Sequence, residues 1–245
     1  MTTAIILAGG LGTRLRGVVP DLPKPMAPVA GRPFLAHQLD LWIAQGVRRF
    51  ILAVGYRHEA IVQHFGGSYR DAALEYSVEP SPLGTGGALL QAAARVGDER
   101  ALLLNGDTWF DVPLPALAAR ATQLDADWCL ALFRHDDPAR YMGVGVDRPG
   151  RVRALRDGAS PLANGGVVWF RPAALHAVAH EPGQVLSLEN DVLPALRAQG
   201  QRFAALECPG AFIDIGVPGD YHRAARVMCP EPAEEPRRPS HAYAY

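Results

Sequence analysis

The chain has 245 residues, of which 49% are hydrophobic, and its 24 basic and 25 acidic side chains leave a formal net charge of −1 at pH 7. A chain of this length can bury a substantial core, and one domain is the default expectation. The near-neutral balance excludes a surface built to coat a polyanion, so we expect neither nucleic acid nor a membrane as a partner.

The first half of the chain alternates between predicted strands and helices. The apolar run "AIILA" (4–8) is too short for a signal peptide or a membrane span, so it predicts a strand. A glycine-rich loop follows, and "FLAHQLDLWIAQG" (34–46) then places apolar residues at helical intervals before a glycine. Further strands are predicted at "FILAV" (50–54), "LEYSV" (74–78) and "ALLLN" (101–105), and further helices at "HEAIVQHF" (58–65) and "GALLQAAARV" (87–96). This alternation predicts an α/β fold, with a Rossmann-like, mixed but mainly parallel sheet covered by helices on both faces.

After Phe110 the alternation loosens into strands joined by short turns. Strands are predicted at "WCLALF" (128–133), "VGVD" (144–147), "VRAL" (152–155), "GVVWF" (166–170) and "FIDIG" (212–216), and a helix at "LENDVLPALRAQG" (188–200). Residues 230–245 contain four prolines and no apolar periodicity. We therefore expect one domain over residues 1–229 and a disordered tail over 230–245.

The cysteines bear on the cellular compartment. Cys129, Cys208 and Cys229 are odd in number, far apart and without CxxC spacing. This pattern favours a reducing compartment over a disulfide framework, so a cytoplasmic location is expected.

The glycine-rich loop "LAGGLGTRL" (7–15) follows the first predicted strand, where ligands of open α/β sheets bind. Glycines let backbone N–H groups approach phosphate oxygens, and Arg14 adds a guanidinium that matches them. We expect the loop to bind a polyphosphate. The nucleotide-binding positions predicted here are Leu7, Ala8, Gly9, Gly10, Gly12 and Thr13. A dinucleotide-binding GxGxxG loop is a weaker alternative, because no glycine stands at its last position and no acidic residue ends the second strand. A glycine-rich turn without any ligand stays open as well.

Lys24 is the only lysine among the 24 basic side chains. The two prolines of "PKP" restrict the backbone on either side of it, so its conformation is fixed before a ligand arrives. An ammonium group is a compact charge that can follow phosphate oxygens as they move, whereas a guanidinium demands a set geometry. We therefore expect Lys24 to bind phosphate. The alternative is that a single lysine occurs by chance on a surface turn and has no functional role.

Two aspartates end predicted strands. Asp107 follows "ALLLN" within "NGD", and Asp214 lies in "FIDIG". Mg²⁺ is usually held by one or two carboxylates while it keeps waters and substrate phosphates as its other ligands. If both strand ends reach the cleft beside the phosphate loop, Asp107 and Asp214 form a Mg²⁺ site. Either aspartate alone is more often a turn residue or a structural acid.

Five motifs occur in one order between residues 3 and 226: "LAGGLGTRL", "PKPM-PV-G-P", "SPLGTGGAL", "NGD" and "FIDIG-P-DY". With them the chain resembles the nucleoside-diphosphate-sugar pyrophosphorylases, the sugar-1-phosphate nucleotidylyltransferases. The resemblance implies a glycosyltransferase-A-like core and an enzyme that joins a nucleoside triphosphate to a sugar 1-phosphate and releases pyrophosphate. It implies that Arg14 and Lys24 bind the phosphates and that Asp107 and Asp214 hold Mg²⁺. A second copy of the chain, giving a homodimer, stays open as a further partner.

The resemblance places "EPSPLGTGGAL" (79–89) around the base, with Glu79 ending a strand and Gly84 and Thr85 opening a helix. Thymidylyl- and uridylyl-transferring relatives often carry glutamine where this chain has Glu79. A carboxylate can only accept hydrogen bonds, and guanine presents two adjacent donors, so Glu79 favours GTP. A solvated Glu79, or one paired with a surface arginine, is the alternative.

The sugar-binding positions implied by the resemblance are Gly143 in "YMGVGVD", Asn164 in "NGGVVWF" and Glu189 in "SLEND". Many relatives also carry a Glu-Lys pair whose lysine binds the sugar phosphate. This chain reads "RALRDG" there, so that contact is absent or is taken over by Arg153 or Arg156. The motifs together resemble most the D-glycero-α-D-manno-heptose 1-phosphate guanylyltransferases of surface-polysaccharide synthesis. Mannose 1-phosphate guanylyltransferases and N-acetylmuramate 1-phosphate uridylyltransferases are the alternatives.

Two other classes of function are less well supported by the sequence. A nucleotide-sugar sensor without turnover would be expected to lose Arg14, Lys24 or a metal aspartate, and none is lost. A zinc hydrolase would need a glutamate that "HAVAH" (176–180) lacks, and this stretch is expected to be part of an amphipathic helix. The tryptophans predicted to be core residues are Trp42, Trp128 and Trp169, whereas Trp109 is placed beside the ligand.

Overall fold

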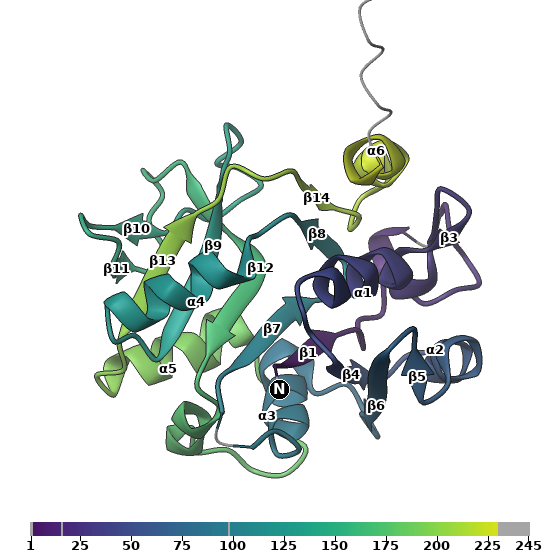
Figure 1. The fold of residues 1–245 in the computed structure, drawn as a ribbon, viewed down its shortest axis with the longest axis horizontal. Helices are drawn as coiled ribbons and strands as arrows, with labels where there is room; N and C mark the ends of the chain where they lie inside the picture. Colours follow the sequence, from purple (N-terminus) through teal and green to yellow (C-terminus); the bar gives the residue numbers. More distant parts are fainter. Residues whose placement is uncertain (1, 16, 98, 230–245) are drawn as a thin grey trace, which may run out of the picture.

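The alternating apolar runs form one eight-stranded sheet in the computed structural model, which describes residues 2–15, 17–97 and 99–229 (Figure 1). In spatial order its strands are β13 (Phe203–Glu207), β9 (Trp128–Arg134), β12 (Leu162–Phe170), β7 (Ala101–Asn105), β1 (Thr3–Leu7), β4 (Arg49–Val54), β6 (Ala72–Val78) and β5 (Ser68–Tyr69). The predicted tail over 230–245 lies outside the described residues.

The centre of the sheet is parallel. Strand β1 pairs in parallel with β4 and β7, and β4 pairs in parallel with β6. Ala4, Ile5 and Ile6 of β1 are fully buried, which is why the strand reads as a continuous apolar run rather than an alternating one. Strand β12 then pairs antiparallel with both β7 and β9, and β13 returns in parallel beside β9. The prediction of a mixed, mainly parallel sheet is confirmed.

Helices cover both faces of the sheet, each over its own apolar cluster. One face carries α1 (Phe34–Ala44), α2 (His58–Phe65) and α4 (Leu114–Gln123), and the other carries α3 (Gly84–Ala93), η3 (Pro172–Ala177), η4 (Leu188–Val192) and α5 (Leu193–Ala198). Trp42 and Trp169 belong to the first cluster and Trp128 to the second, as predicted for core residues. No helix within the described part of the chain is long and apolar enough to cross a membrane.

Short strands and one further helix lie outside the eight-stranded sheet. They are β2 (Pro28–Val29), β3 (Arg32–Pro33), β8 (Thr108–Phe110), β10 (Gly145–Val146), β11 (Val152–Ala154), β14 (Phe212–Asp214) and α6 (Pro218–Met228). A third apolar cluster joins Ala27 and Val29 to Ile213 and Ile215 beneath α6. This cluster fixes the segment after the lysine motif against the segment that carries Asp214.

Several elements differ from the sequence-based expectation. The helix expected over 188–200 begins as the single π-helical turn η4 and continues as α5, ending at Ala198. Strand β14 ends at Asp214 instead of residue 216. The expectation of an amphipathic helix over "HAVAH" is wrong, since the 3-10 helix η3 ends at Ala177. Pro172 at its start and the Glu-Pro-Gly sequence after it favour a short turn over a helix.

Candidate functional site

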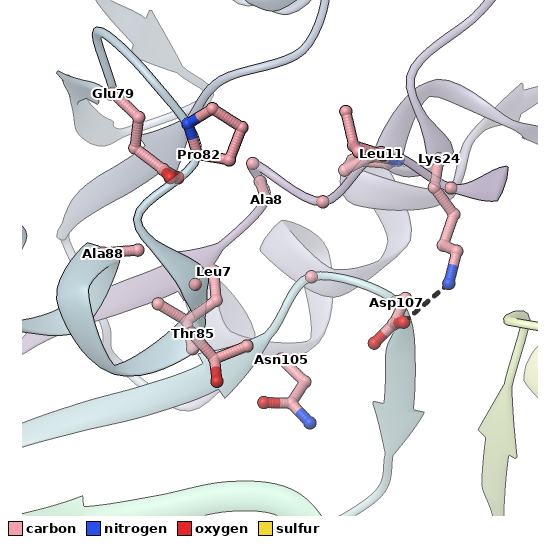
Figure 2. A pocket seen from close by; sticks show the side chains of 16 residues that line it. Leu7, Ala8, Leu11, Lys24, Glu79, Pro82, Thr85, Ala88, Asn105 and Asp107 are labelled. Carbon is pink, nitrogen blue, oxygen red and sulfur yellow. Dashed lines mark hydrogen bonds and ion pairs between the residues drawn. The ribbon is translucent and has the colours of Figure 1, made fainter. Parts of the chain in front are cut away.

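A pocket of about 290 Å³ opens where β1 and β7 end and α3 begins (Figure 2). Its walls are the glycine loop after β1, the start of α3 and the turn after β7. The lining residues are Leu7, Ala8, Gly9, Gly10, Leu11, Gly12, Lys24, Pro25, Glu79, Pro82, Gly84, Thr85, Ala88, Asn105, Gly106 and Asp107. The pocket therefore lies at the carboxyl ends of parallel strands, the location expected for a ligand site in such a sheet.

The glycine loop passes along this pocket with little side-chain volume. Gly9, Gly10 and Gly12 line it, and Gly12 has a φ of +59° beside Lys24. A left-handed backbone of this kind favours glycine. Thr13 and Arg14 follow as exposed residues of the 3-10 turn η1 (Thr13–Leu15), outside the lining.

Gly106 holds the ends of β1 and β7 together. Its N–H donates to the Leu7 carbonyl at 2.9 Å. An added Cβ would lie only 2.4 Å from that oxygen and 2.9 Å from Ala8 Cα. Because the opposing atoms are backbone, they cannot swing aside as a flexible side chain could, so the "NGD" turn requires glycine at this position.

Gly106→Ala is expected to destabilise the protein by about 2 kcal/mol, the usual range for a side chain forced into a packed interior. The urea midpoint should fall with little change in the slope of the transition. Gly67→Ala is the matched control, because an added Cβ there would meet no atom within 4 Å. Equal midpoints for the two variants would contradict this account of the turn.

Lys24 reaches the pocket from the opposite wall. Its Nζ donates to Asp107 Oδ2 at 2.7 Å, and only 12% of its side chain is exposed (Figure 2). Pro23 has the extended φ and ψ of −65° and 146°, and the buried Pro25 and Met26 anchor the 3-10 turn η2 (Lys24–Met26). The backbone of the lone lysine is thus held by its prolines, as the sequence predicts.

Asp214 is brought to the same place by strand pairing. Strand β14 pairs antiparallel with β8, opposite Thr108, and the Ile215 N–H donates to the Asp107 carbonyl at 2.9 Å. Ile213 and Ile215 are buried in the third apolar cluster, so alternation along the chain points Asp214 to the other side. Residues 107 and 214, far apart in sequence, therefore adjoin.

The electrostatics of Asp214 agree with this proximity. Burial raises the pKa of its carboxyl, and the neighbouring Asp107 charge raises it further. An ideal Cβ on Gly216 would lie 2.7 Å from Asp214 Oδ1 and 3.3 Å from Lys24 Nζ. Lys24, Asp107 and Asp214 thus meet at one point, as the sequence-based hypothesis requires.

The aspartate couple has the chemistry of a hard-cation site. In residues 2–15, 17–97 and 99–229, no group of three or more His, Cys, Asp and Glu side chains could by itself hold a metal. The couple instead offers two repelling, partly buried carboxylates beside an open pocket. A divalent cation that takes its remaining ligands from water and phosphate fits such a pair.

Glu79 lies at the other end of the pocket from Lys24 (Figure 2). Its Oε2 accepts a hydrogen bond from the Leu83 N–H at 3.0 Å, and burial raises the pKa of its carboxyl. Its Oε1 lies against Gly9, where an added Cβ would be 2.1 Å away. Glu79 is therefore half-buried and is not paired with an arginine among the described contacts, and one of its oxygens is free of a backbone partner.

The start of α3 is held by a crossing segment of chain. The Leu186 carbonyl accepts hydrogen bonds from the N–H groups of Gly86 and Gly87 at 2.8 and 3.3 Å. Gly84, at a φ of +70°, would place a Cβ only 2.4 Å from that carbonyl oxygen. Thr85 Oγ1 accepts from the Leu188 N–H at 2.8 Å, so both predicted positions, Gly84 and Thr85, support the pocket wall.

The three predicted sugar-binding residues lie outside the pocket lining. Gly143 is buried, and an added Cβ would lie 2.2 Å from the Asp157 carbonyl oxygen. Asn164 accepts from the Gly166 N–H at 3.1 Å, closing the turn in β12. Glu189 lies exposed on η4, with its Oε2 3.5 Å from Thr85 Oγ1. Of the three, only Glu189 is tied directly to a pocket residue.

Arg153 and Arg156, the proposed substitutes for a sugar-phosphate lysine, do not line the pocket. Both are exposed, and Arg153 Nε lies 3.9 Å from Asp147 Oδ2 at the β10–β11 hairpin.

Two residues of the site carried no signal in the sequence. Gln38 of α1 donates to the carbonyls of Asn105 and Thr108 at 2.8 and 2.5 Å, so it supports the turn that carries Asp107. Arg140 contacts Asp214.

Trp109, expected beside the ligand, instead packs partly buried against the third apolar cluster and is absent from the pocket lining. Side chains alternate between the two faces along β8, and Trp109 pairs with Ile213 on the face away from Asp214. This alternation explains why Trp109 does not lie where the sequence led us to expect it.

Comparison with known proteins gives a consistent result. A family model described as "Nucleotidyl transferase" matches residues 3–230. A D-glycero-alpha-D-manno-heptose 1-phosphate guanylyltransferase of Aneurinibacillus thermoaerophilus is 38% identical over 228 residues, which cover 92% of this chain and 97% of the relative. A mannose-1-phosphate guanylyltransferase of Mycobacterium tuberculosis is 33% identical over 240 residues, or 94% of this chain and 66% of the relative. The crystal structure of HddC from Yersinia pseudotuberculosis complexed with GMP-PN is 31% identical, with a TM-score of 0.79 over 92% of this chain and 99% of that one.

Proposed function

Because this chain belongs to the nucleotidyl transferase family, we propose that it transfers GMP from GTP to D-glycero-α-D-manno-heptose 1-phosphate, giving a nucleoside-diphosphate sugar and pyrophosphate. The observation that carries this proposal is the pocket with a carboxylate at one end and a lysine–aspartate cluster at the other. The first end suits a base, and the second suits the phosphates.

In the proposed reaction a phosphate oxygen of the sugar 1-phosphate attacks the α-phosphorus of the nucleotide. A P–O bond forms there as the bond to the bridging oxygen of pyrophosphate breaks. The nucleophile arrives already ionised on the substrate, so the protein needs no covalent intermediate and acts by orientation and charge neutralisation. Lys24, which pairs with Asp107 beside the pocket, is proposed to neutralise charge at the α-phosphate, and Arg14 is proposed to reach the phosphates from the turn after the glycine loop.

Asp107 and Asp214 are the residues proposed to hold Mg²⁺. A bound Mg²⁺ would supply further neutralisation of the phosphate oxygens. The protein contributes the fixed separation of the two carboxylates, since Asp107 follows β7 and Asp214 ends β14, and the two segments are hydrogen-bonded to each other.

Glu79 is proposed to read guanine. It lies at the end of the pocket away from the phosphates, and one carboxylate oxygen is already committed to the Leu83 N–H. The second oxygen can accept from the adjacent N1–H and 2-amino donors that guanine presents. Relatives named guanylyltransferases support the same base.

Glu79→Gln is expected to lower kcat/KM for GTP by about 10- to 100-fold, the loss associated with a hydrogen bond to a charged acceptor. The amide N–H groups of glutamine would also face the N–H donors of guanine, which disfavours GTP. The difference in kcat/KM between GTP and UTP should therefore become smaller. Glu59→Gln on the exposed surface of α2 serves as the control. An unchanged ratio of kcat/KM for GTP over UTP would contradict base reading by Glu79.

The sugar end of the site is proposed to involve Gly143, Asn164 and Glu189. Of these, Glu189 lies beside the Thr85 hydroxyl, so it adjoins the nucleotide pocket. Heptose 1-phosphate is favoured because a relative of that name is matched over nearly its whole length. Mannose 1-phosphate is the second candidate, favoured by another named relative.

The experiment that tests the whole proposal is a pyrophosphate-release assay with Mg²⁺, four nucleoside triphosphates and a panel of sugar 1-phosphates. We expect the greatest kcat/KM for GTP with the heptose 1-phosphate. Preference for UTP with N-acetylmuramate 1-phosphate would overturn the assignment of both substrates. Absence of turnover with every pair would contradict a transferase and favour a nucleotide-sugar sensor.

A further inference from the structure

Arg140 lies between two carboxylates of the segment that runs from β14 into α6, far along the chain from Arg140 itself. It is on the loop between β9 and β10, three residues before Gly143. Its Nη2 is 3.7 Å from Asp214 Oδ2 and forms a close ion pair with Asp220 Oδ2 in the first turn of α6. One guanidinium thus joins the loop, the strand end and the helix.

The position of Arg140 is set by rigid surroundings. Asp220 is only 5% exposed and also pairs with Arg223, one turn along α6. The Arg140 guanidinium lies 4.9 Å from the centre of the Tyr141 ring, a cation–π distance. Tyr141 in turn packs edge-on against Phe133, with ring centres 5.0 Å apart. Because Asp220 and the Tyr141 ring already restrict the Arg140 side chain, it loses little further conformational entropy when it interacts with Asp214.

The contact with Asp214 differs in kind from the pair with Asp220. At 3.7 Å the Arg140–Asp214 contact is too long for a hydrogen bond, so it acts through charge alone. The other carboxylate oxygen, Asp214 Oδ1, accepts from the Gly216 N–H at 2.6 Å. The backbone therefore fixes one oxygen of Asp214, while Oδ2 is oriented by a cation yet keeps its lone pairs for a ligand.

Charge balance shows that Arg140 is not needed merely to neutralise Asp220. Arg223 already pairs with that carboxylate. On the other side, Lys24 pairs with Asp107, and Asp214 has no comparably short cation contact among the described residues. The Asp107 charge helps to raise the pKa of Asp214, and the charges of Lys24 and then Arg140 act against it. Of these two cations, Lys24 is hydrogen-bonded to Asp107, whereas Arg140 lies 3.7 Å from Asp214 Oδ2.

We propose that Arg140 is a positioning residue that orients the Asp214 carboxylate for metal binding. Through its ion pair with Asp220, Arg140 also holds the loop that leads to Gly143 against α6. The proposal rests on the proposed function, because the orientation of Asp214 matters to turnover only if the aspartate couple holds the metal. Groups behind a first ligand commonly change metal affinity or activity by about 10- to 100-fold.

The test compares Arg140→Ala, Arg140→Lys and Arg223→Ala in the full chain. Mn²⁺ binding is followed by electron paramagnetic resonance in the presence of a non-reacting GTP analogue, and kcat, KM for GTP and the urea midpoint are measured alongside. For Arg140→Ala we expect about 10-fold weaker Mn²⁺ binding and a kcat lowered about 10- to 100-fold, with KM for GTP changed less than about 2-fold. Arg140→Lys should recover part of the Mn²⁺ affinity, because it keeps the charge but not the fork.

Arg223→Ala is the matched control, because Arg223 shares Asp220 with Arg140, whereas the ion pair with Asp214 is made by Arg140. It should leave Mn²⁺ affinity unchanged even if the urea midpoint falls. An equal loss of Mn²⁺ affinity in Arg223→Ala, or unchanged Mn²⁺ affinity in Arg140→Ala, would overturn the proposal. If Arg140→Ala does not fold, Arg140→Gln is read by the same criteria.

Asp214→Asn separates this inference from the proposed function. If Asp214→Asn abolishes Mn²⁺ binding while Arg140→Ala leaves it intact, only the role of Arg140 fails. If Asp214→Asn itself leaves Mn²⁺ binding and turnover unchanged, the metal assignment of the proposed function fails and the role of Arg140 with it.

Discussion

Asp214→Asn is expected to lower kcat about 1,000-fold or more, because the loss of one electrostatic group from a preorganised site costs about 100- to 1,000-fold and the loss of a proposed Mg²⁺ ligand should cost at least as much. The amide keeps the volume of the carboxyl, and its oxygen can still accept from the Gly216 N–H. The loss should therefore appear in kcat and in Mg²⁺ dependence, measured by pyrophosphate release over a range of Mg²⁺ concentrations.

The same variant should not lose stability in the absence of metal. Burial and Asp107 raise the pKa of Asp214 in the folded protein, so its charged form is less favourable folded than unfolded. A carboxyl with a raised pKa destabilises the fold at pH values above that pKa, and the neutral amide removes this penalty. We expect an equal or higher urea midpoint at pH 7 without metal.

Asp136→Asn, on the exposed loop after β9, is the control for both measurements. A folded Asp214→Asn enzyme with near-normal turnover would show that the aspartate couple does not serve the reaction. A large fall in its metal-free midpoint would instead show that Asp214 is a structural acid.

Lys24→Arg is expected to lower kcat about 100-fold or more even though the charge is kept. The space around Nζ suits a small ammonium group. Asp107 Oδ2 is 2.7 Å away, and even a Cβ added to Gly216 would lie only 3.3 Å from Nζ. A planar guanidinium on a side chain held at both flanks by proline cannot occupy that position without moving Asp107 or Asp214.

Single-turnover kinetics with GTP and the preferred sugar 1-phosphate would separate chemistry from product release in this variant. Arg57→Lys, an exchange between the same two residue types at an exposed position, controls for the substitution itself. Near-normal turnover of Lys24→Arg would show that charge alone is required and that the single lysine of the chain has no special place in the site.

Local signals account for the parts of the fold that the sequence predicted well. Strands β1, β4 and β7 are buried on both faces, so each is an unbroken apolar run that ends at a glycine or polar residue. Helix α1 is a similar case, with regular apolar spacing and a glycine two residues beyond its end. The glycine loop and the "PKP" turn could also be predicted, because their backbone geometry depends on residue type.

Elements without such a pattern were not predicted. Helix α6 is mostly polar, and it is held by Ala224 and Met228 against the third apolar cluster rather than by a long apolar stripe. Helix α4 begins after proline and exposes much of its surface. Strand β13 has a short, alanine-rich sequence that becomes a strand only because β9 lies beside it.

The site was predictable in its residue types but not in its long-range contacts. Asp107 and Asp214 could be named from strand ends, yet their meeting depends on the register of β8 with β14, which are far apart in the chain. Arg140 gave no signal, since an arginine in a polar loop is ordinary until its partners on β14 and α6 are known. Trp109 was misplaced for the same reason, because the face of a three-residue strand is set by its partner.

The crossing of the Leu186 backbone over the start of α3 has a consequence for redesign. The carbonyl of Leu186 binds the first turn of the helix, and its N–H donates to the Leu83 carbonyl at 2.9 Å. The following residues include Glu189, which is proposed to bind the sugar. A stretch exchanged to alter the proposed sugar site would therefore also change the contacts that Leu188 and Glu189 make with Thr85 in the pocket wall. The same stretch taken from a relative can pack against the start of α3 only if positions 84, 86 and 87 have no side chain. The two segments would therefore have to be exchanged together.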